Sequence, residues 1–283
     1  MSIMTGLSGN EMYCLHLKGL SPGELVVGNS VYSLGFVGGI GAGLQSAFGG
    51  EVTQVTQIIH EGRQHSYARM VEEAQQRGGA GITGVTSELR AFRGNIEFLS
   101  VASCVHAADQ KTEKLLFSTS GDGQELYCLL DAGYSPRKFV FGNVAYSTGI
   151  GGGLLGSLKS LARGEIKQFS DIFNTTRHLA LARIMADASA VGANAVVGIE
   201  TEIMPFRGVH EMLMMGTAAH NPALDARHAK EPVTSDLTCE EMWNLTNMGY
   251  MPLKLVLGTA VYSLGLFGGL KAMFKSFSRG EVT

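Results

Sequence analysis

The chain repeats itself, and this self-similarity constrains its fold more than any other feature of the sequence. Residues 11–15 (EMYCL) recur 114 positions later as residues 125–129 (ELYCL). The same separation joins further pairs along the copy: Gly28 and Gly142, Tyr32 and Tyr146, Arg69 and Arg183, Glu88 and Glu202, Phe92 and Phe206, and His106 and His220. Because the separation is constant, neither copy contains an insertion relative to the other.

A third copy follows the second by 116 residues and contains the first half of the pattern. Residues 241–243 (EMW), Tyr262 and Gly280 match the second copy, and the sequence ends at Thr283. Self-similarity at this length predicts duplicated domains rather than a short-period solenoid. Since half a module cannot build its own sheet and helix, we expect the third copy to pack onto another part of the protein.

The repeat sets the expected domain limits. We predict a first module at 8–108, a linker at 109–121, a second module at 122–221, a linker at 222–237 and a truncated third module at 238–283.

Each copy opens with the signature of a short capped helix. Ser8 and Glu11 have the spacing of a capping box, in which the first side chain and the glutamate each accept a hydrogen bond from a backbone amide of the first turn. The pattern recurs at 122–125 and 238–241, and a glycine suited to the left-handed closing conformation follows eight residues after each glutamate. We therefore predict a helix of about two turns at the start of every copy.

The remaining pattern of each module predicts a strand, a long helix and two further strands. Apolar, β-favouring runs lie at 25–27, 139–141 and 255–257, and a helical pattern spans about 168–191. Strands at 195–204 and 211–219 are joined by a glycine-containing hairpin. The fold class is thus α+β, with tandem β-α-β-β modules, each preceded by a capped helix. A three-stranded sheet with one helix leaves free edges, which such modules remove by pairing or by forming rings.

Composition excludes several classes of protein. The formal net charge is −3, whereas a nucleic-acid-binding protein needs a basic face. Four cysteines in 283 residues do not make a disulfide scaffold, and no secretory signal opens the chain, so we expect a cytoplasmic protein with free thiols. Residues 25–50 and 139–158 are uncharged and long enough to span a membrane, but their many Gly, Ser and Asn residues favour a buried strand followed by a turn.

One segment carries a family resemblance. Residues 183–199 (RIMADASAVGANAVVGI) resemble the YbjQ family, in which a helix ends in A-x-x-x-G-A-N-A-V-V-G, and residues 216–218 (GTA) match the end of its last strand. The resemblance covers about 24–108 and 138–221, and the third copy only through its first strand. It implies a β-α-β-β module like the dodecin subunit, assembled as a pentameric ring, with a heavy-metal-binding label but no catalytic residues to transfer.

Candidate ligand sites are weak. Cys14, Cys104, Cys128 and Cys239 show no C-x-x-C spacing, so buried structural thiols are favoured over metal ligands. Met212, Met214 and Met215 could bind a soft metal, but their alternation along a strand favours core packing. Residues 151–156 (GGGLLG) match a dinucleotide-binding pattern without the parallel strand that should follow it, which favours a tight bend. We expect no resident cofactor, and a metal site stays an alternative.

Charged residues that recur in both copies are the candidates for an interface or a pocket. They are Arg69 and Arg183 in the long helix, Glu88 and Glu202 on one strand, Glu97 and Glu211 on the next strand, and Arg93 and Arg207 at the hairpin. Because the chain has few charges, repeated ones favour ion pairs at module interfaces; the alternative is a pocket that binds an anion. No catalytic triad or carboxylate pair follows from the spacing.

These patterns favour a non-enzymatic, repeat-built oligomer. Five chains would supply ten modules, so we expect a homopentamer of two stacked module rings with the half copy packed at one end. One alternative is a protein that binds a metal or small ligand between modules. The other is a membrane-peripheral scaffold that uses its glycine-rich segments and the C-terminal amphipathic segment 266–279, where bulky apolar residues mix with three cations.

Overall fold

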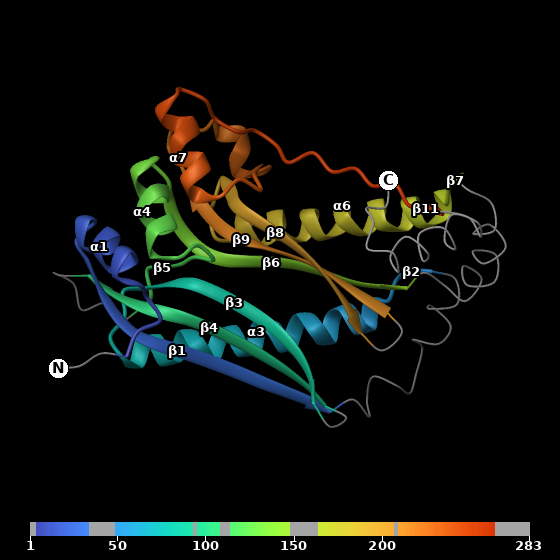
Figure 1. The fold of residues 1–283 in the computed structure, drawn as a ribbon, viewed down its shortest axis with the longest axis horizontal. Helices are drawn as coiled ribbons and strands as arrows, with labels where there is room; N and C mark the ends of the chain where they lie inside the picture. The colour runs from blue at the N-terminus through green and yellow to red at the C-terminus, as the bar shows by residue number, and fades with distance from the viewer. Residues whose placement is uncertain are drawn as a thin grey trace, which may run out of the picture.

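Two main β-sheets and two long helices make up most of the described part of the molecule (Figure 1). The computed structural model describes residues 4–33, 49–92, 95–107, 114–147, 164–206 and 209–263. The helix of the first module lies between the two sheets, and the helix of the second module covers the far face of the second sheet. Because α3 contacts both sheets, the two modules meet in a shared core.

The first module is a mixed sheet with one long helix. Its elements are α1 (Gly9–Leu17), β1 (Leu20–Ser33), β2 (Gly50–Glu51), α3 (Thr53–Gln76), β3 (Gly81–Phe92) and β4 (Asn95–Ala107). The strand order is β1-β4-β3-β5, in which β5 (Phe117–Ser118) runs parallel to β3 and the other pairs are antiparallel. The predicted linker 109–121 therefore contributes a short strand to the sheet that precedes it.

The second module repeats this plan. Its elements are α4 (Gly123–Asp131), β6 (Ser135–Ser147), β7 (Gly164–Glu165), α6 (Lys167–Ala190), β8 (Ala195–Phe206) and β9 (Val209–His220). The 3-10 helix η2 (Ala226–Ala229) and β10 (Val233–Thr234) follow it, and the strand order is β10-β8-β9-β6-β2. Because β2 belongs to the first module, the first module lends a strand to the sheet of the second.

The third copy contributes α7 (Cys239–Asn247) and β11 (Tyr262–Ser263), which pairs with β7. We predicted a strand at 255–257, but residues 251–261 belong to no regular strand. A strand needs a neighbour to complete its ladder of hydrogen bonds, and the described part of the third copy provides none.

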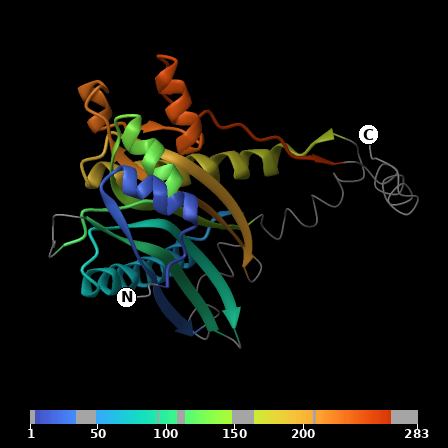
Figure 2. The same cartoon turned by 60° about the vertical axis from the view of Figure 1, so that its left-hand side comes forward.

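All three capped helices are confirmed. The side chains of Ser8, Asp122 and Thr238 each accept a hydrogen bond from the backbone amide of a glutamate three residues later, and the carboxylate of that glutamate accepts one from the backbone amide of the cap. Each helix is followed by a glycine in the left-handed region, with φ of 71°, 82° and 80° in copy order. Figure 2 shows α1, α4 and α7 following one another at one end of the molecule.

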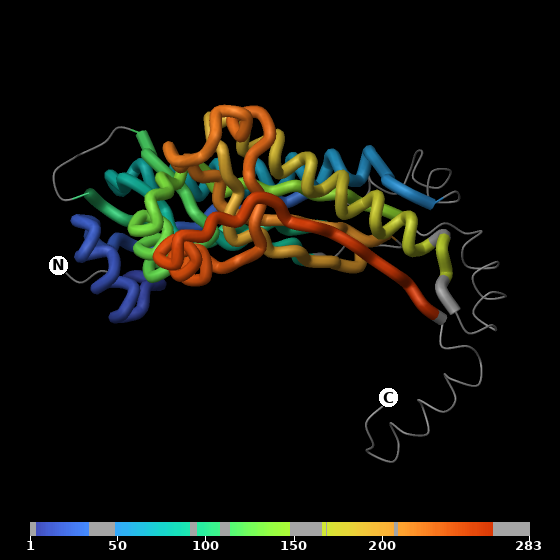
Figure 3. Tube along the Cα trace, turned by 90° about the horizontal axis from the view of Figure 1, so that it is seen from above, coloured from blue at the N-terminus to red at the C-terminus, as the bar shows by residue number. Residues whose placement is uncertain are grey.

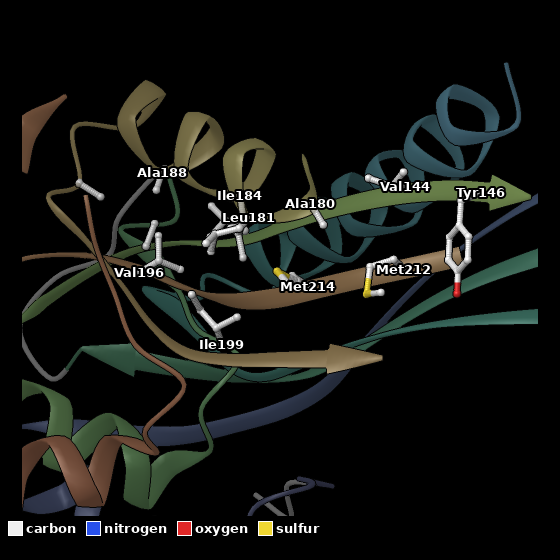
Figure 4. Packing of buried hydrophobic residues seen from close by; sticks show 13 residues of the cluster. Val144, Tyr146, Ala180, Leu181, Ile184, Ala188, Val196, Ile199, Met212 and Met214 are labelled. Atoms are coloured by element: carbon white, nitrogen blue, oxygen red, sulfur yellow. The ribbon is translucent and has the colours of Figure 1, made fainter. Parts of the chain in front are cut away.

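The core of the second module forms between its own helix and sheet. Figure 4 shows Ala180, Ile184 and Ala188 of α6 facing the sheet, where Met212 and Met214 point into the same cluster. Met215 lies on the opposite face and packs in the cluster between the modules. The three methionines are therefore core residues, as their alternation predicted.

The helix and strand approach most closely at a glycine that recurs in both modules. A side chain at Gly142 would collide with the carbonyl oxygen of Ala180 and come within 2.8 Å of the amide nitrogen of Ile184. Gly28 has the same relation to the backbone of α3. Only glycine lets the backbone of the strand lie against the helix at this distance.

We predict that Gly142→Ala destabilises the fold, because the rigid backbone of α6 must move to admit a methyl group. The expected loss is about 2–3 kcal/mol in the free energy of unfolding, measured by urea denaturation followed by circular dichroism. Gly9→Ala is the control, since no atom lies within 4 Å of the position that its methyl group would take. Equal stability of the two variants would contradict this account of the packing.

Candidate functional site: the interface between modules

The face of the second sheet that points away from α6 packs against a helix of the other module. Phe139 and Phe141 of β6 and Leu213 of β9 point away from α6 and pack against α3 of the first module. Tyr67 of α3 lies with its ring centroid 5.8 Å from that of Phe139. Apolar burial from two modules thus forms one continuous cluster.

An ion pair is buried inside this apolar contact. The guanidinium of Arg63 in α3 donates to both carboxylate oxygens of Glu211 in β9, at 3.0 and 2.8 Å, and both side chains are 0% exposed. The remaining nitrogen of Arg63 donates to the carbonyl and hydroxyl oxygens of Ser87, at 2.7 and 3.0 Å. A buried charge without a partner costs several kcal/mol, so this bidentate geometry ties α3 to one position on the second sheet.

Polar contacts outside this buried ion pair also join the first module to the second. Arg183 of α6 binds Glu51 of β2 at 2.8 Å and donates to the carbonyl of Asn143 at 2.7 Å. The side chain of Asn143 lies 3.2 Å from Nδ1 of His60 in α3. Each of these bonds, apart from that to the Asn143 carbonyl, joins the first module to the second.

The capped helices are linked by their capping glutamates. Glu11 accepts a hydrogen bond from the amide of Gly123, the first residue of α4, at 3.3 Å. Glu125 accepts the equivalent bond from Cys239, the first residue of α7, also at 3.3 Å. One carboxylate therefore caps its own helix and the first turn of the next, which sets the third copy beside the second as the second lies beside the first.

The structure places the repeated charges in different surroundings. Arg183 and Glu211 form ion pairs between the modules, whereas Arg69 donates to the carbonyl of Asn29 within its own module. Glu97 is half-buried on β4 and takes part in no ion pair between described residues. Arg93 and Arg207 lie outside the described residues, as do 151–156 and 266–279.

Glu88 and Glu202 border a cavity between the modules with a volume of about 430 Å³. Glu88 also binds Arg90 at 2.6 Å. The cavity is lined by three further carboxylates, Glu125, Glu200 and Asp236. Such a lining repels anions, so it does not favour the anion-pocket interpretation of these two glutamates.

The thiols have the chemistry of structural cysteines. Cys104, Cys128 and Cys239 are buried, and Cys14 is half-buried. Burial raises the pKa of Cys104 and Cys128 to about 11 in each case, which keeps them protonated at neutral pH, whereas a metal ligand is a thiolate. Across the described ranges, no group of three or more His, Cys, Asp or Glu side chains is arranged to hold a metal ion.

Sequence reasoning missed Arg63. It recurs as Arg177 at the separation of 114 residues, which was a usable signal. A lone arginine in a polar stretch of a long helix is typical of a solvated face, however, and only the packing of a second sheet onto that face shows its role. None of the helices in the described residues combines the length and apolar character needed to cross a membrane.

Comparison with known proteins matches both modules to one family. The YbjQ family model, described as "Putative heavy-metal-binding", matches residues 21–105 and 135–221. The chain is 32% identical over 229 residues to the encapsulin nanocompartment protein Rv1762c of Mycobacterium tuberculosis, covering 77% of this chain and 85% of that protein. It is 41% identical over 83 residues to a UPF0145 protein of Vibrio campbellii, covering 29% of this chain and 80% of the relative. The search of solved structures gives no significant match.

We predict that breaking the buried ion pair costs far more than removing it. Arg63→Met leaves the carboxylate of Glu211 buried without a partner, and the expected loss is about 3–5 kcal/mol of unfolding free energy. The double variant Arg63→Met/Glu211→Leu should recover most of this loss. Arg90→Met removes an exposed pair and serves as the control, with an expected change of about 1 kcal/mol or less. A double variant as unstable as the single one would show that the charge is not the cause.

We also predict that the four thiols differ in reactivity. In the native protein at pH 8, iodoacetamide should modify Cys14 first, because the buried thiols are inaccessible and two of them have pKa values near 11. Peptide mass spectrometry measures the rate at each site, and urea should make the four rates similar. Reaction of Cys239 as fast as Cys14 in the native state would contradict its burial.

Proposed function

The chain belongs to the YbjQ family, and from that premise we propose that it is a self-assembling structural protein whose subunits join head to tail through the module interface. A relative that aligns with most of the chain is named as an encapsulin nanocompartment protein. This supports a non-enzymatic role as a structural part of such a compartment. The YbjQ family match to both modules supports assembly from repeated modules.

One observation carries the proposal: equivalent strands of the two modules differ in burial on only one face. In β6, every residue from Phe139 to Ser147 is buried, whereas β1 alternates between buried and exposed residues. The strands β9 and β4 show the same difference. The face that is buried in the second sheet and open in the first is the one that receives the helix of the preceding module.

The open face of the first sheet carries exposed apolar side chains on β1. Leu25, Val27 and Val31 are 38%, 43% and 59% exposed, and they correspond to Phe139, Phe141 and Ala145, which are buried against the first module. Exposed apolar side chains grouped on one face in this way are typical of a protein interface. Since the same face of the second sheet accepts α3, the first sheet is suited to accept α6 of another subunit.

This relation also bears on the shape of the assembly. Within one chain the helix of the first module packs on the sheet of the second, so the two modules are neighbours joined through this contact. The expected homopentamer of two stacked rings would separate them into different rings. We therefore favour head-to-tail closure in which first and second modules alternate around one ring.

The membrane-peripheral alternative depends on 266–279, which lie outside the described residues. The alternative of a metal site between modules gains nothing from the described thiols, since three of the four are buried and two have pKa values near 11.

We predict that the protein forms oligomers whose mass rises with concentration, measured by sedimentation velocity and native mass spectrometry. Val27→Glu should abolish them, because a buried carboxylate in an apolar contact is strongly unfavourable. Leu116→Glu is the matched control, since Leu116 is 54% exposed and lies at the edge of the sheet beside β5. A wild-type protein that stays monomeric across the concentration range would refute the proposal.

A further inference from the structure

We infer that residues 251–263, of which Tyr262 and Ser263 pair with β7 and which are here called the third-copy strand, are an intramolecular stand-in for strand β1 of the next subunit. The next subunit would displace this strand from α6 and bring Glu97 to Arg177. This inference rests on the proposed head-to-tail assembly and adds that a segment of the same chain competes with the next subunit. Figure 3 shows the third-copy strand running along the second module to β7.

The third-copy strand binds the second module as β6 binds the first. Tyr262 pairs with Glu165 in the ladder, as Tyr146 pairs with Glu51. Ile166 donates its amide to the carbonyl of Val261 at 2.7 Å, as Val52 does to Ala145 at 2.8 Å. These contacts place the third-copy strand where a first strand of a following module belongs.

A side-chain hydroxyl at the start of each long helix binds the third-copy strand and β6 in the same way. The amide of Val261 donates to Oγ of Ser170 at 2.9 Å, and the amide of Ala145 donates to Oγ1 of Thr56 at the same distance. Ser170 and Thr56 are equivalent positions at the start of the two long helices. The site on α6 is therefore specific for the backbone of a first strand, whichever chain supplies it.

The third-copy strand fits this site less well than a complete module would. Among the described residues, Arg177, the equivalent of Arg63, donates to the carbonyl of Gly258 at 3.4 Å and to no carboxylate. At the positions of the His60–Asn143 bond, Asn174 Oδ1 and Thr259 Oγ1 are buried and have no hydrogen-bond partner among the described residues. Unsatisfied buried polar groups weaken the contact.

The third-copy strand packs few side chains on the second module: Leu255 and Leu257 contact the core cluster of α6, whereas other side chains stay exposed. Its side chains include Leu253, Val256 and Tyr262, which are 59%, 86% and 67% exposed. On α3 the equivalent site is covered by β6 together with β9 and β8, whereas α6 has this single strand. The described part of the third copy contains no counterpart of Glu211.

Another subunit can supply that counterpart. Glu97 lies between Val31 of β1 and Arg90 of β3, just as Glu211 lies between Ala145 of β6 and Met204 of β8. Arg90 is already bound to Glu88, and Glu97 is half-buried on the open face.

Asn29, the equivalent of Asn143, lies on the same face as Glu97 and can meet Asn174. The docking of a whole module would thus satisfy Arg177 and Asn174 together.

The first test exchanges the charges of the proposed pair between subunits. Arg177→Glu and Glu97→Arg should each weaken the self-association constant by about thirtyfold or more, measured by sedimentation equilibrium. The double variant Glu97→Arg/Arg177→Glu should return the constant to within about fivefold of wild type. Urea unfolding of each variant checks that the intrachain Arg63–Glu211 pair still holds the fold. Lack of recovery in a folded double variant would overturn the inference.

The second test weakens the stand-in. Val261→Pro removes the amide that donates to Ser170, so the third-copy strand should yield more readily and self-association should rise about fivefold. Val256→Pro is the matched control, because Val256 is 86% exposed and no backbone bond of its amide is found among the described residues. Unchanged or weaker association of Val261→Pro would show that the third-copy strand does not compete with the next subunit.

The two proposals fail in different ways. If wild type stays monomeric across the concentration range, the head-to-tail function is refuted. If wild type assembles and Val27→Glu prevents it, but the charge exchange or Val261→Pro gives the contrary result, only the stand-in mechanism is refuted.

Discussion

The structure depends on the need of an open β-sheet to have both faces covered. A module of this kind has one long helix, and that helix covers only one face of its own sheet. The second sheet obtains its other cover from α3 of the preceding module, which is buried on both sides as a result. The hydrophobic effect therefore acts across module boundaries, and the two modules share one core rather than holding two separate ones.

The buried ion pair gives this shared core its specificity. Apolar surfaces tolerate sliding, because their contact energy depends on area and little on register. Arg63 and Glu211 do not tolerate it: a shift along the strand would leave two buried charges without partners. We interpret the pair as the element that fixes which residue of α3 meets which residue of β9, while the surrounding phenylalanine and leucine side chains supply most of the stabilisation.

Local patterns in the sequence predicted the elements of the two complete modules but not their partners, and the strand predicted at 255–257 is not formed. The capping boxes, the closing glycines and the alternation of Met212, Met214 and Met215 identified the helices and the two buried faces of β9, since each depends on a few neighbouring residues. Whether a helix of another module covers the outer face of a strand does not depend on neighbouring residues in the sequence. Leu25 and Phe139 are both apolar at equivalent positions, yet one is 38% exposed and the other 1%. The difference comes from what precedes each module in the chain.

The candidate charges illustrate the same limit. Repetition singled out Glu97 and Glu211 as a pair of equivalent positions, and the structure gives them different surroundings because only Glu211 has a helix above it. Arg63, the partner of Glu211, escaped notice, since a charge in the middle of a long helix has no local mark that distinguishes a buried site from a solvated one. Knowledge of the repeat together with the sheet order would have identified it.

A stand-in strand on the same chain changes the thermodynamics of assembly rather than its geometry. A tethered segment competes at an effective concentration of about millimolar, so it excludes weak or partial encounters with another subunit. A complete module displaces it only by adding contacts that the strand lacks: the two neighbouring strands, the carboxylate for Arg177 and the amide for Asn174. Assembly then requires a correctly folded first module in the incoming subunit. The poor fit of the third-copy strand is therefore consistent with a reversible cover, which a tightly fitting strand could not provide.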